Sequence, residues 1–414
     1  MAGEKTKKQE DEKAQLQLQR QIGLLSAVCL IAGTVVGSGI FIAPKGVLMN
    51  SGNSVGLSLL VWTLSGVLSL FGSLCYAELG TTFKKSGAHY TYLLETLGPL
   101  PAFLRLWVEF LFIRPAVTSY VALAFGRYVV EPFFAPCAAP TVLVKLVSIL
   151  GLTLVVAVNC WSVSMASRTQ VTLTFIKTFS LILIIVPGVI TLSKGQTENF
   201  QNGFDVNVTS LHKLPLAFYN GLYAYGGWFY LNFVTEEVIN PTRNIPLAVI
   251  LSMVTVTVFY VLINVAYYTV MTPAEMLLSD TVAVYPFFLV MLITGEIYQL
   301  INFASAARWF FIALATLGLL IHRYRFPLHP RPFKVPIVIT VIFTVVCFFI
   351  VGLSLYSDPW NIGKSLALTL TGVPVYYVTI YRSCLPNKWR RALNYCTKQL
   401  QILLEVAQQE VQTY

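Results

Sequence analysis

Charged residues are scarce in this 414-residue chain, at 11% of the composition against about 25% in a typical soluble domain. Hydrophobic residues make up 56% of the sequence, and the mean hydropathy is +0.70. Apolar runs of more than about 20 residues recur, as transmembrane helices require. The short alternating segments that a membrane β-barrel needs do not occur. The composition therefore predicts an all-α polytopic membrane protein.

Sequence motifs of soluble-type enzymes are also missing. There is no GxxxxGK(S/T) phosphate loop and no HExxH zinc motif, and the chain has only 4 histidines. Its 7 cysteines contain no CxxC pair, so a zinc site is not expected. We therefore expect neither an enzyme nor a protein that holds a metal or a cofactor.

The chain also lacks an evident cleavable signal peptide, because its first 20 residues are polar and highly charged. The net charge of +10 would suggest a nucleic-acid partner in a soluble protein. Here the cations gather in alternate loops, such as HRYRFPLHPRPFK at 322–334, which fits the positive-inside rule better. We therefore expect the lipid bilayer and not nucleic acid as partner, with both termini in the cytoplasm.

The apolar runs predict ten membrane spans, each about long enough to cross the hydrocarbon core. They are 22–47, 55–80, 101–130, 141–161, 169–193, 214–236, 246–270, 299–321, 335–355 and 362–382. A shorter run at 281–294 would place the basic loop outside if it crossed, so a re-entrant or interfacial segment is expected. The chain would then divide into a cytoplasmic tail at 1–21, a transmembrane domain at 22–382 and an amphipathic cytoplasmic tail at 383–414.

Glycines interrupt two of the predicted spans. The first span contains GTVVGSGIF at 33–41, and the sixth contains YAYGGWFY at 223–230. Glycine costs about 1 kcal/mol relative to alanine inside a helix, so both stretches predict a break. Five spans separate the breaks in order, which is the layout of transporters built from two inverted five-helix repeats.

Unwound backbone within a bilayer must be buried in protein or line a water-filled cavity. The N-terminus of a half-helix attracts a carboxylate, and freed carbonyls on the other broken span accept from an ammonium group. Together they would recognise the head group of an α-amino acid. Gly33 and Gly37 alternatively form a GxxxG packing motif, but two breaks in matching positions favour the binding interpretation.

Three cations lie deep within predicted spans. Arg114 is near mid-depth, where an arginine costs roughly 2.5–3.5 kcal/mol, so it should face either an ion-pair partner or an anion-binding cavity. Glu109 is five residues earlier, but in an α-helix it would not share the same face. If Arg308 faces the cavity as well, a substrate with extra negative charge is favoured. Lys177 either extends toward the membrane surface or acts as a fixed cation in place of an ion.

Two residues of the predicted outer loops are candidates for covalent modification. Cys137 lies where thiols oxidise, and no obvious extracellular cysteine of this chain could pair with it. This favours an intermolecular disulfide. The sequence NVT at 207–209 makes Asn207 a candidate glycosylation site.

Four motifs, GSGIFIAPKGVL, LCYAELGTTFKKSG, LPLAFYNGLYAYGGW and NFVTEEVINP, resemble the light subunits of heteromeric amino-acid transporters. The resemblance covers nearly the whole chain. It implies two inverted five-helix repeats with two extra helices in a multi-pass protein of the plasma membrane. It also implies sodium-independent exchange of extracellular cystine for intracellular glutamate. A neutral or cationic amino-acid exchanger of the same family is the alternative.

The resemblance also assigns roles to individual residues. The implied substrate-binding residues are Gly37, Ser38, Gly39 and Ile40 for the α-carboxylate, Ala224, Tyr225 and Gly226 for the amine, and Arg114, Tyr223 and Arg308 for the second acidic group. Lys177 would replace an ion. Cys137 would be joined by a disulfide to a single-span glycoprotein heavy chain.

The second repeat departs from the family pattern in its length. The first repeat runs from Gly37 to Lys194, whereas the second runs from Gly226 only to His322, about 60 residues fewer and enough for two helices. The missing stretch would fall where Val284 runs directly into Tyr285. A shortened isoform that binds the heavy chain without transporting is therefore a further alternative.

Overall fold

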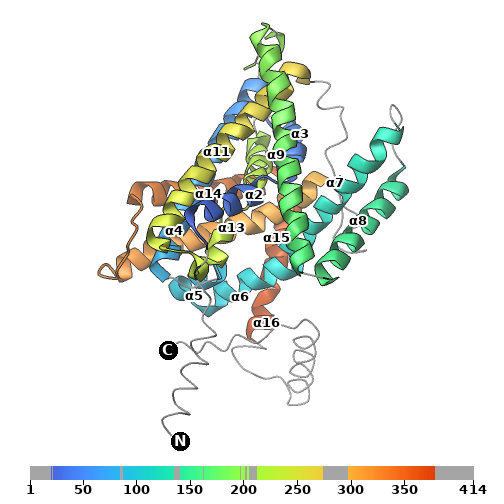
Figure 1. Cartoon of the computed structure of the whole chain (residues 1–414). Coiled ribbons are helices and arrows are strands. Elements are labelled where there is room, and N and C mark those ends of the chain that lie inside the picture. Colours follow the sequence, from blue (N-terminus) through green and yellow to red (C-terminus); the bar gives the residue numbers. More distant parts are fainter. Residues whose placement is uncertain are drawn as a thin grey trace, which may run out of the picture.

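The computed structural model describes residues 20, 22–83, 87–134, 140–161, 163–195, 197–200, 203–204, 212–273 and 297–377. Cys137, Asn207, the short run at 281–294 with the Val284–Tyr285 junction, and nearly all of both predicted tails lie outside these residues. The described part is almost entirely helical, and its one β-bridge joins Ile22 to Val238 (Figure 1).

The helices follow the predicted spans closely. The α-helices are α2 (Leu24–Val35), α3 (Gly39–Asn50), α4 (Val55–Phe83), α5 (His89–Leu97), α6 (Pro99–Val108), α7 (Arg114–Phe134), α8 (Thr141–Trp161), α9 (Val163–Ser193), α10 (Leu214–Ala224), α11 (Pro241–Val270), α13 (Ile297–Arg325), α14 (Ile337–Ser357), α15 (Pro359–Leu370) and α16 (Gly372–Tyr376). A π-helical segment, η1 (Glu109–Ile113), joins α6 to α7, and short 3₁₀ turns are η2 (Glu198–Phe200), η4 (Tyr230–Phe233) and η5 (Thr235–Glu237).

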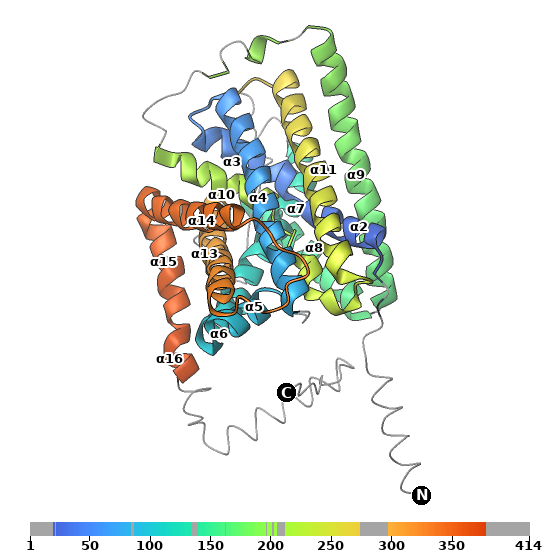
Figure 2. The same ribbon diagram turned by 90° about the vertical axis from the view of Figure 1, so that its left-hand side faces the viewer.

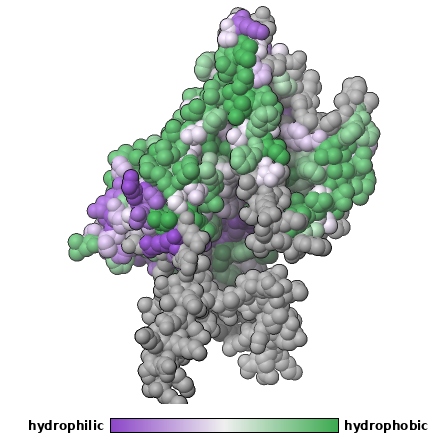
Figure 3. Space-filling view, in the orientation of Figure 1, coloured by the Kyte–Doolittle hydropathy of each residue, from purple (hydrophilic) through white to green (hydrophobic). Residues whose placement is uncertain are grey.

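Seven helices of the described residues are long and apolar enough to cross a membrane. The pair α2 and α3 passes the same test as one span broken by a bend of 49°. Apolar side chains cover α11, α8 and the upper part of α9 on the face in Figure 3, while hydrophilic ones gather at the lower left. An apolar surface around long helices is what a lipid environment requires. The chain is therefore a polytopic helical membrane protein, as its composition predicts.

The two broken helices lie at the centre of the bundle. The short helix α10 packs against α3, and the long helix α11 packs against α2, α4 and α9. On another side, α13 contacts α14, α15 and α5 (Figure 2). Large aromatic side chains fill the middle, and Trp62, Tyr225 and Tyr260 are all fully or almost fully buried. The long helices thus form a scaffold around two short ones.

The sixth predicted span differs beyond its break, because no α-helix resumes there. After α10 ends at Ala224, the chain makes only the 3₁₀ turns η4 and η5. It then pairs with the segment before α2, since the Ile22 amide donates to the Glu237 carbonyl at 3.0 Å and the Ile239 amide donates to the Ile22 carbonyl at 3.0 Å. These bonds replace the helical ones that the sequence pattern predicts.

A buried carboxylate ties three segments together at one end of α4. Glu78 is fully buried and accepts from Arg323 of α13 through two hydrogen bonds, that from Nε being 2.9 Å long. The Val335 amide, just before α14, donates to the same carboxylate at 2.8 Å. Charge pairing with this many hydrogen bonds offsets the cost of burying the carboxylate.

We expect Glu78→Ala to destabilise the protein by about 3–5 kcal/mol, because the change leaves a partly buried guanidinium without its partner. Heat-induced unfolding of the purified protein in detergent measures this loss as a lower midpoint. Glu237→Ala is the control, since the Glu237 side chain makes no ion pair within the part of the chain that the structure describes. Equal midpoints for both variants would contradict the role of Glu78.

Candidate substrate site

The first break lies between Val35, where α2 ends, and Gly39, where α3 begins. Val36 has φ −71° and ψ 86°, which is not helical. Ser38 precedes α3 but its side chain makes no capping hydrogen bond. The first backbone amides of a helix have no partner within the helix. The start of α3 is therefore a polar, positively polarised end inside the bundle, suited to a carboxylate.

The second break follows α10 at Ala224. The amide of Gly226 turns back to the Tyr223 carbonyl at 3.0 Å, and Gly227 has a φ of +124°, which disfavours any residue with a side chain. The last carbonyls of a helix carry partial negative charge, which attracts an ammonium group. Both breaks that the glycines predict are thus confirmed.

The two breaks touch each other. A Cβ atom added to Gly39 would lie 2.6 Å from the Ala224 Cα atom, so only glycine allows this approach. A Cβ atom on Gly37 would meet nothing closer than the Val35 carbonyl oxygen at 3.8 Å. Gly39 therefore permits contact between the positive end of one helix and the negative end of another, whereas Gly37 borders open space.

A cavity of about 180 Å³ opens at this contact. Its lining comes from both breaks, from α7, from the segment after α10, and from α13. The lining residues are Thr34, Val35, Gly37, Ser38, Gly39, Val117, Val121, Tyr223, Ala224, Gly226, Gly227, Phe229, Tyr230 and Arg308. It thus gathers most of the residues that the sequence singles out for substrate binding. Ile40 and Tyr225 are buried beside it and do not line it.

Arg308 supplies the cation of this cavity. Its Nε atom is buried and has no hydrogen-bond partner, and the side chain forms no ion pair among the residues that the structure describes. A guanidinium carries five donors in a planar fork that matches a carboxylate. An unpaired arginine in a low-dielectric cavity is costly until an anion binds. The cavity is therefore suited to an anionic group.

Arg114 lies beside this cavity and is paired. Its Nε atom donates to Glu109 Oε1 at 2.7 Å, and Glu109 also accepts from Arg105. The expectation that Glu109 and Arg114 lie on different faces is wrong, because Glu109–Ile113 is π-helical. The Arg114 amide bonds to the Glu109 carbonyl, so residues five apart become neighbours on one face.

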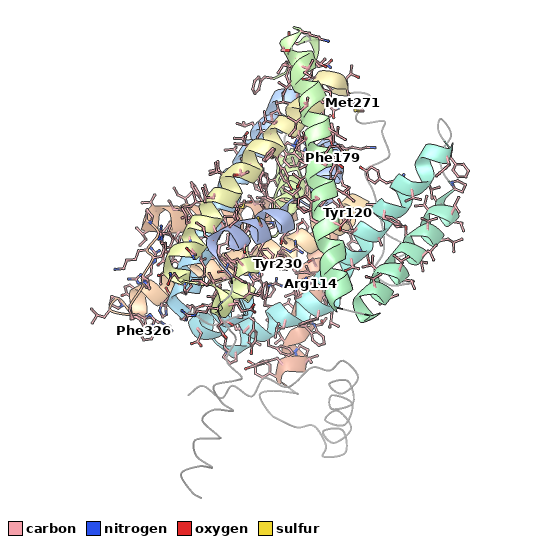
Figure 4. All side chains as sticks on the ribbon, in the orientation of Figure 1. Arg114, Tyr120, Phe179, Tyr230, Met271 and Phe326 are labelled. Carbon is pink, nitrogen blue, oxygen red and sulfur yellow. The ribbon has the colours of Figure 1, made fainter. Side chains whose placement is uncertain are left out.

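Pro115 gives the physical reason for this π-helical turn. Proline lacks an amide hydrogen, so it cannot continue the α-helical bonding ladder, and π-bulges accommodate such interruptions. Arg114 keeps 46% of its side chain exposed despite the ion pair. Its guanidinium also lies 5.4 Å from the centre of the Tyr230 ring, and the two residues meet in Figure 4. Tyr230 in turn lines the cavity of Arg308.

Arg114 also lines a second cavity of about 360 Å³. Its lining residues are Gly87, His89, Tyr90, Arg105, Leu106, Glu109, Phe110, Arg114 and Phe233. The Arg114 side chain therefore lines one cavity beside α6 and contacts Tyr230, which lines the other cavity at the helix breaks.

Lys177 lines a third cavity, of about 220 Å³, between α2, α9 and α11. Gly33 and Val36 of the first broken span are part of its wall, so this cavity and the Arg308 cavity flank the same end of α2. Lys177 makes no ion pair with another described residue. A cation thus lies beside the first break without contacting the Arg308 cavity.

One residue of the site escapes prediction from sequence. Tyr260 of α11 is fully buried, and its hydroxyl donates to the carbonyls of Val35 and Ala224 at 2.8 and 3.1 Å. These carbonyls end α2 and α10. Within the apolar run VTVFYVLIN, the sequence pattern predicts only that this tyrosine is a core residue. Only the contact across helices reveals its role.

Long apolar helices, two central breaks and a cavity between them define a class of protein. Irregular backbone at membrane depth that lines a cavity is the arrangement of multi-pass membrane transporters. No group of three or more His, Cys, Asp or Glu that could hold a metal occurs in the described ranges. The chain is a polytopic membrane transporter.

The comparisons identify its family. Residues 22–290 match the family model described as amino acid permease. The chain is 47% identical to the human (Homo sapiens) cystine/glutamate transporter, over 95% of this chain and 92% of that protein. It is 35% identical to the b(0,+)-type amino acid transporter 1 of Mus musculus, over 95% and 94%, and 36% identical to the large neutral amino acids transporter small subunit 2 of Rattus norvegicus, over 88% and 81%. The chain belongs to the amino acid permease family.

The alignment with the human relative bears on the shortened second repeat. It spans 462 positions, whereas this chain has 414 residues in all. The relative therefore has residues without a counterpart here, which agrees with the shortfall that the repeat lengths indicate. The junction itself lies outside the described residues.

Proposed function

We propose that this chain is the light chain of a sodium-independent antiporter that exchanges extracellular cystine for intracellular glutamate at the plasma membrane. Arg308 carries the proposal, because it is an unpaired arginine in a cavity between the ends of two broken helices. The helix ends suit the zwitterionic head of an α-amino acid, and the arginine suits a second acidic group. A cationic substrate would be repelled by the same arginine.

Each predicted substrate residue then has a role. The backbone from Gly37 to Ile40 would bind the α-carboxylate, and the carbonyls from Ala224 to Gly226 would bind the amine. Tyr223 would border the substrate side chain, since it lines the cavity and its ring packs edge-on to Tyr120 at 5.0 Å. Arg308 would hold the second carboxylate. Ile40 and Tyr225 do not line the cavity, and they would support it as buried neighbours of Gly39 and Ala224.

The similarities support this substrate class over the alternatives. The chain is 47% identical to the cystine/glutamate transporters of Homo sapiens and Pongo abelii. Its identity to the b(0,+)-type and large-neutral transporters given above is 35 to 36%. A neutral amino acid would leave the buried Nε atom of Arg308 without a hydrogen-bond acceptor in the loaded state, which is unfavourable.

The test is cystine uptake by proteoliposomes that contain this chain with its heavy chain. We expect uptake to require glutamate inside, to be unaffected when choline replaces sodium, and to be weak with internal lysine or leucine. Sodium independence follows from Lys177, which would act as a fixed cation at the first break. Uptake driven equally well by internal leucine would contradict the proposal.

We expect Arg114→Ala to lower glutamate uptake, but by less than Arg308→Ala. Arg114 already donates to Glu109 and its side chain is 46% exposed, so the residue contributes less to binding an anion. Initial rates of glutamate uptake in proteoliposomes measure the difference. A larger loss in Arg114→Ala than in Arg308→Ala would contradict the assignment of Arg308 as the main anion-binding residue.

The heavy chain would be joined through Cys137. We expect Cys137→Ser to abolish a disulfide-linked species of higher mass on a non-reducing gel when both chains are co-expressed. Cys347→Ser serves as the control, because Cys347 is buried in α14. If the linked species persists in Cys137→Ser, the assignment is wrong. We also propose that both termini, with the tails at 1–21 and 383–414, lie in the cytoplasm, and that Asn207 carries a glycan. Both proposals can be tested in the same expression system.

A second function is favoured by the shortened second repeat. The chain would bind the heavy chain without transporting and would compete with a complete light chain. Co-expression with a full-length light chain should then lower cystine uptake in proportion to the amount of this chain. No effect on uptake, together with glutamate exchange by this chain alone, would exclude this function.

A further inference from the structure

One phenolic hydroxyl connects the two helix breaks. The Tyr260 hydroxyl lies 2.8 Å from the Val35 carbonyl oxygen and 3.1 Å from the Ala224 carbonyl oxygen. A phenol has a single hydrogen to donate, so the two carbonyls share it. Val35 and Ala224 are the last residues of α2 and α10, where carbonyls lack helical partners.

The ring that carries this hydroxyl is held rigidly. Tyr260 is fully buried, 5.8 Å edge-on from Trp62 of α4 and 4.9 Å from Tyr225. Its helix, α11, packs against α4, α9 and α2. The hydroxyl is therefore fixed to the scaffold and not to either broken helix.

The spacing of the two breaks determines the cavity. Val35 and Ala224 both line it, and a Cβ atom at Gly39 would clash with Ala224. A small separation of α2 from α10 would move the α3 amides relative to the carbonyls that follow α10. Tyr260 itself does not line the cavity, so it would act on a substrate only through these backbone groups.

We propose that Tyr260 is a positioning residue that sets the distance between the two helix breaks and thereby the affinity for the amino-acid head group. This inference rests on the proposed function, in which those breaks bind the head group. Because every α-amino acid shares that head group, Tyr260 affects all substrates by the same factor. Arg308, in contrast, discriminates among side chains.

The test is the affinity of Tyr260→Phe, which removes the hydroxyl and keeps the ring. We expect the Kd of the purified chain–heavy chain complex for glutamate and for leucine to rise by the same factor, about threefold to tenfold for one shared hydrogen bond. Scintillation proximity with radiolabelled amino acids measures both constants. The ratio of the two Kd values should not change.

Tyr268→Phe is the matched control. Tyr268 lies on the same helix, is equally buried, and its hydroxyl bonds to Ser58 at 2.7 Å, away from the breaks. We expect its Kd values to equal those of the wild type. Unchanged Kd values in Tyr260→Phe, or a change confined to one amino acid, would overturn the role of Tyr260.

The same data distinguish the two proposals. If the wild type binds leucine more tightly than glutamate, the proposed substrate is wrong. The effect of Tyr260→Phe is then judged from the Kd for leucine. If the wild type prefers glutamate but Tyr260→Phe binds it equally well, only the role of Tyr260 is wrong. A wild-type complex that binds neither amino acid contradicts both.

Discussion

Replacing Arg308 with alanine is expected to lower glutamate uptake about 30-fold or more. Truncating one partner of a desolvated charge pair costs about 2–5 kcal/mol, and each 1.4 kcal/mol is a factor of ten. In the proposed function the lost contact is to the second carboxylate of the substrate, so binding of leucine should fall far less. Initial rates of exchange in proteoliposomes, measured for both amino acids, give the two losses.

Two further variants make this result specific. Arg308→Lys retains the charge but loses the planar fork, so we expect an intermediate rate. Arg325→Ala removes an exposed arginine from the end of the same helix and should behave like the wild type. Equal losses for glutamate and leucine in Arg308→Ala would mean that Arg308 serves the fold and not the recognition of an acid.

Replacing Gly39 with alanine is expected to abolish transport by forcing the two broken helices apart. The new Cβ atom would lie 2.6 Å from the Ala224 Cα atom, and a backbone atom cannot move aside as a flexible side chain can. Overpacking of this kind costs about 1–3 kcal/mol. We therefore expect a lower midpoint of heat-induced unfolding together with loss of amino-acid binding.

Alanine substitutions at two other glycines distinguish an effect on helix packing from an effect on substrate binding. Gly352→Ala in α14 meets no atom within 4 Å and should leave both unfolding and transport unchanged. Gly37→Ala meets only the Val35 and Thr34 carbonyls at 3.8 and 3.9 Å, so it should fold normally. Its methyl group borders the cavity, and we expect weaker binding without a change in the unfolding midpoint. Normal transport by Gly39→Ala would contradict the close contact of the breaks.

Much of this architecture can be predicted from local sequence. Apolar runs identify the long helices, because the bilayer imposes their length and composition. Glycines clustered at matching positions of two runs identify the breaks, whereas single glycines such as Gly66 and Gly318 lie within unbroken helices. The stretch 33–41 predicts the first break, and α2 ends at Val35 and α3 begins at Gly39 within it.

Contacts that depend on unusual helix geometry or on distant segments cannot be predicted in this way. The Glu109–Arg114 ion pair requires a π-helical turn, whereas α-helical spacing places the two residues on different faces. The hydrogen bonds from Arg323 to Glu78 join α13 to α4, and those of Tyr260 join three helices. The partners of Glu78 and Tyr260 are distant in sequence, so no periodic pattern indicates them.

The central claim is that the two helix breaks bind the charged head of an amino acid. A density map of the chain with its heavy chain in saturating glutamate tests it directly. We expect ligand density between the backbone of Gly37 to Gly39 and that of Ala224 to Gly226, with its far end toward Arg308. Continuous helices through 33–41 and 223–230, or glutamate bound elsewhere with this cavity empty, would contradict it.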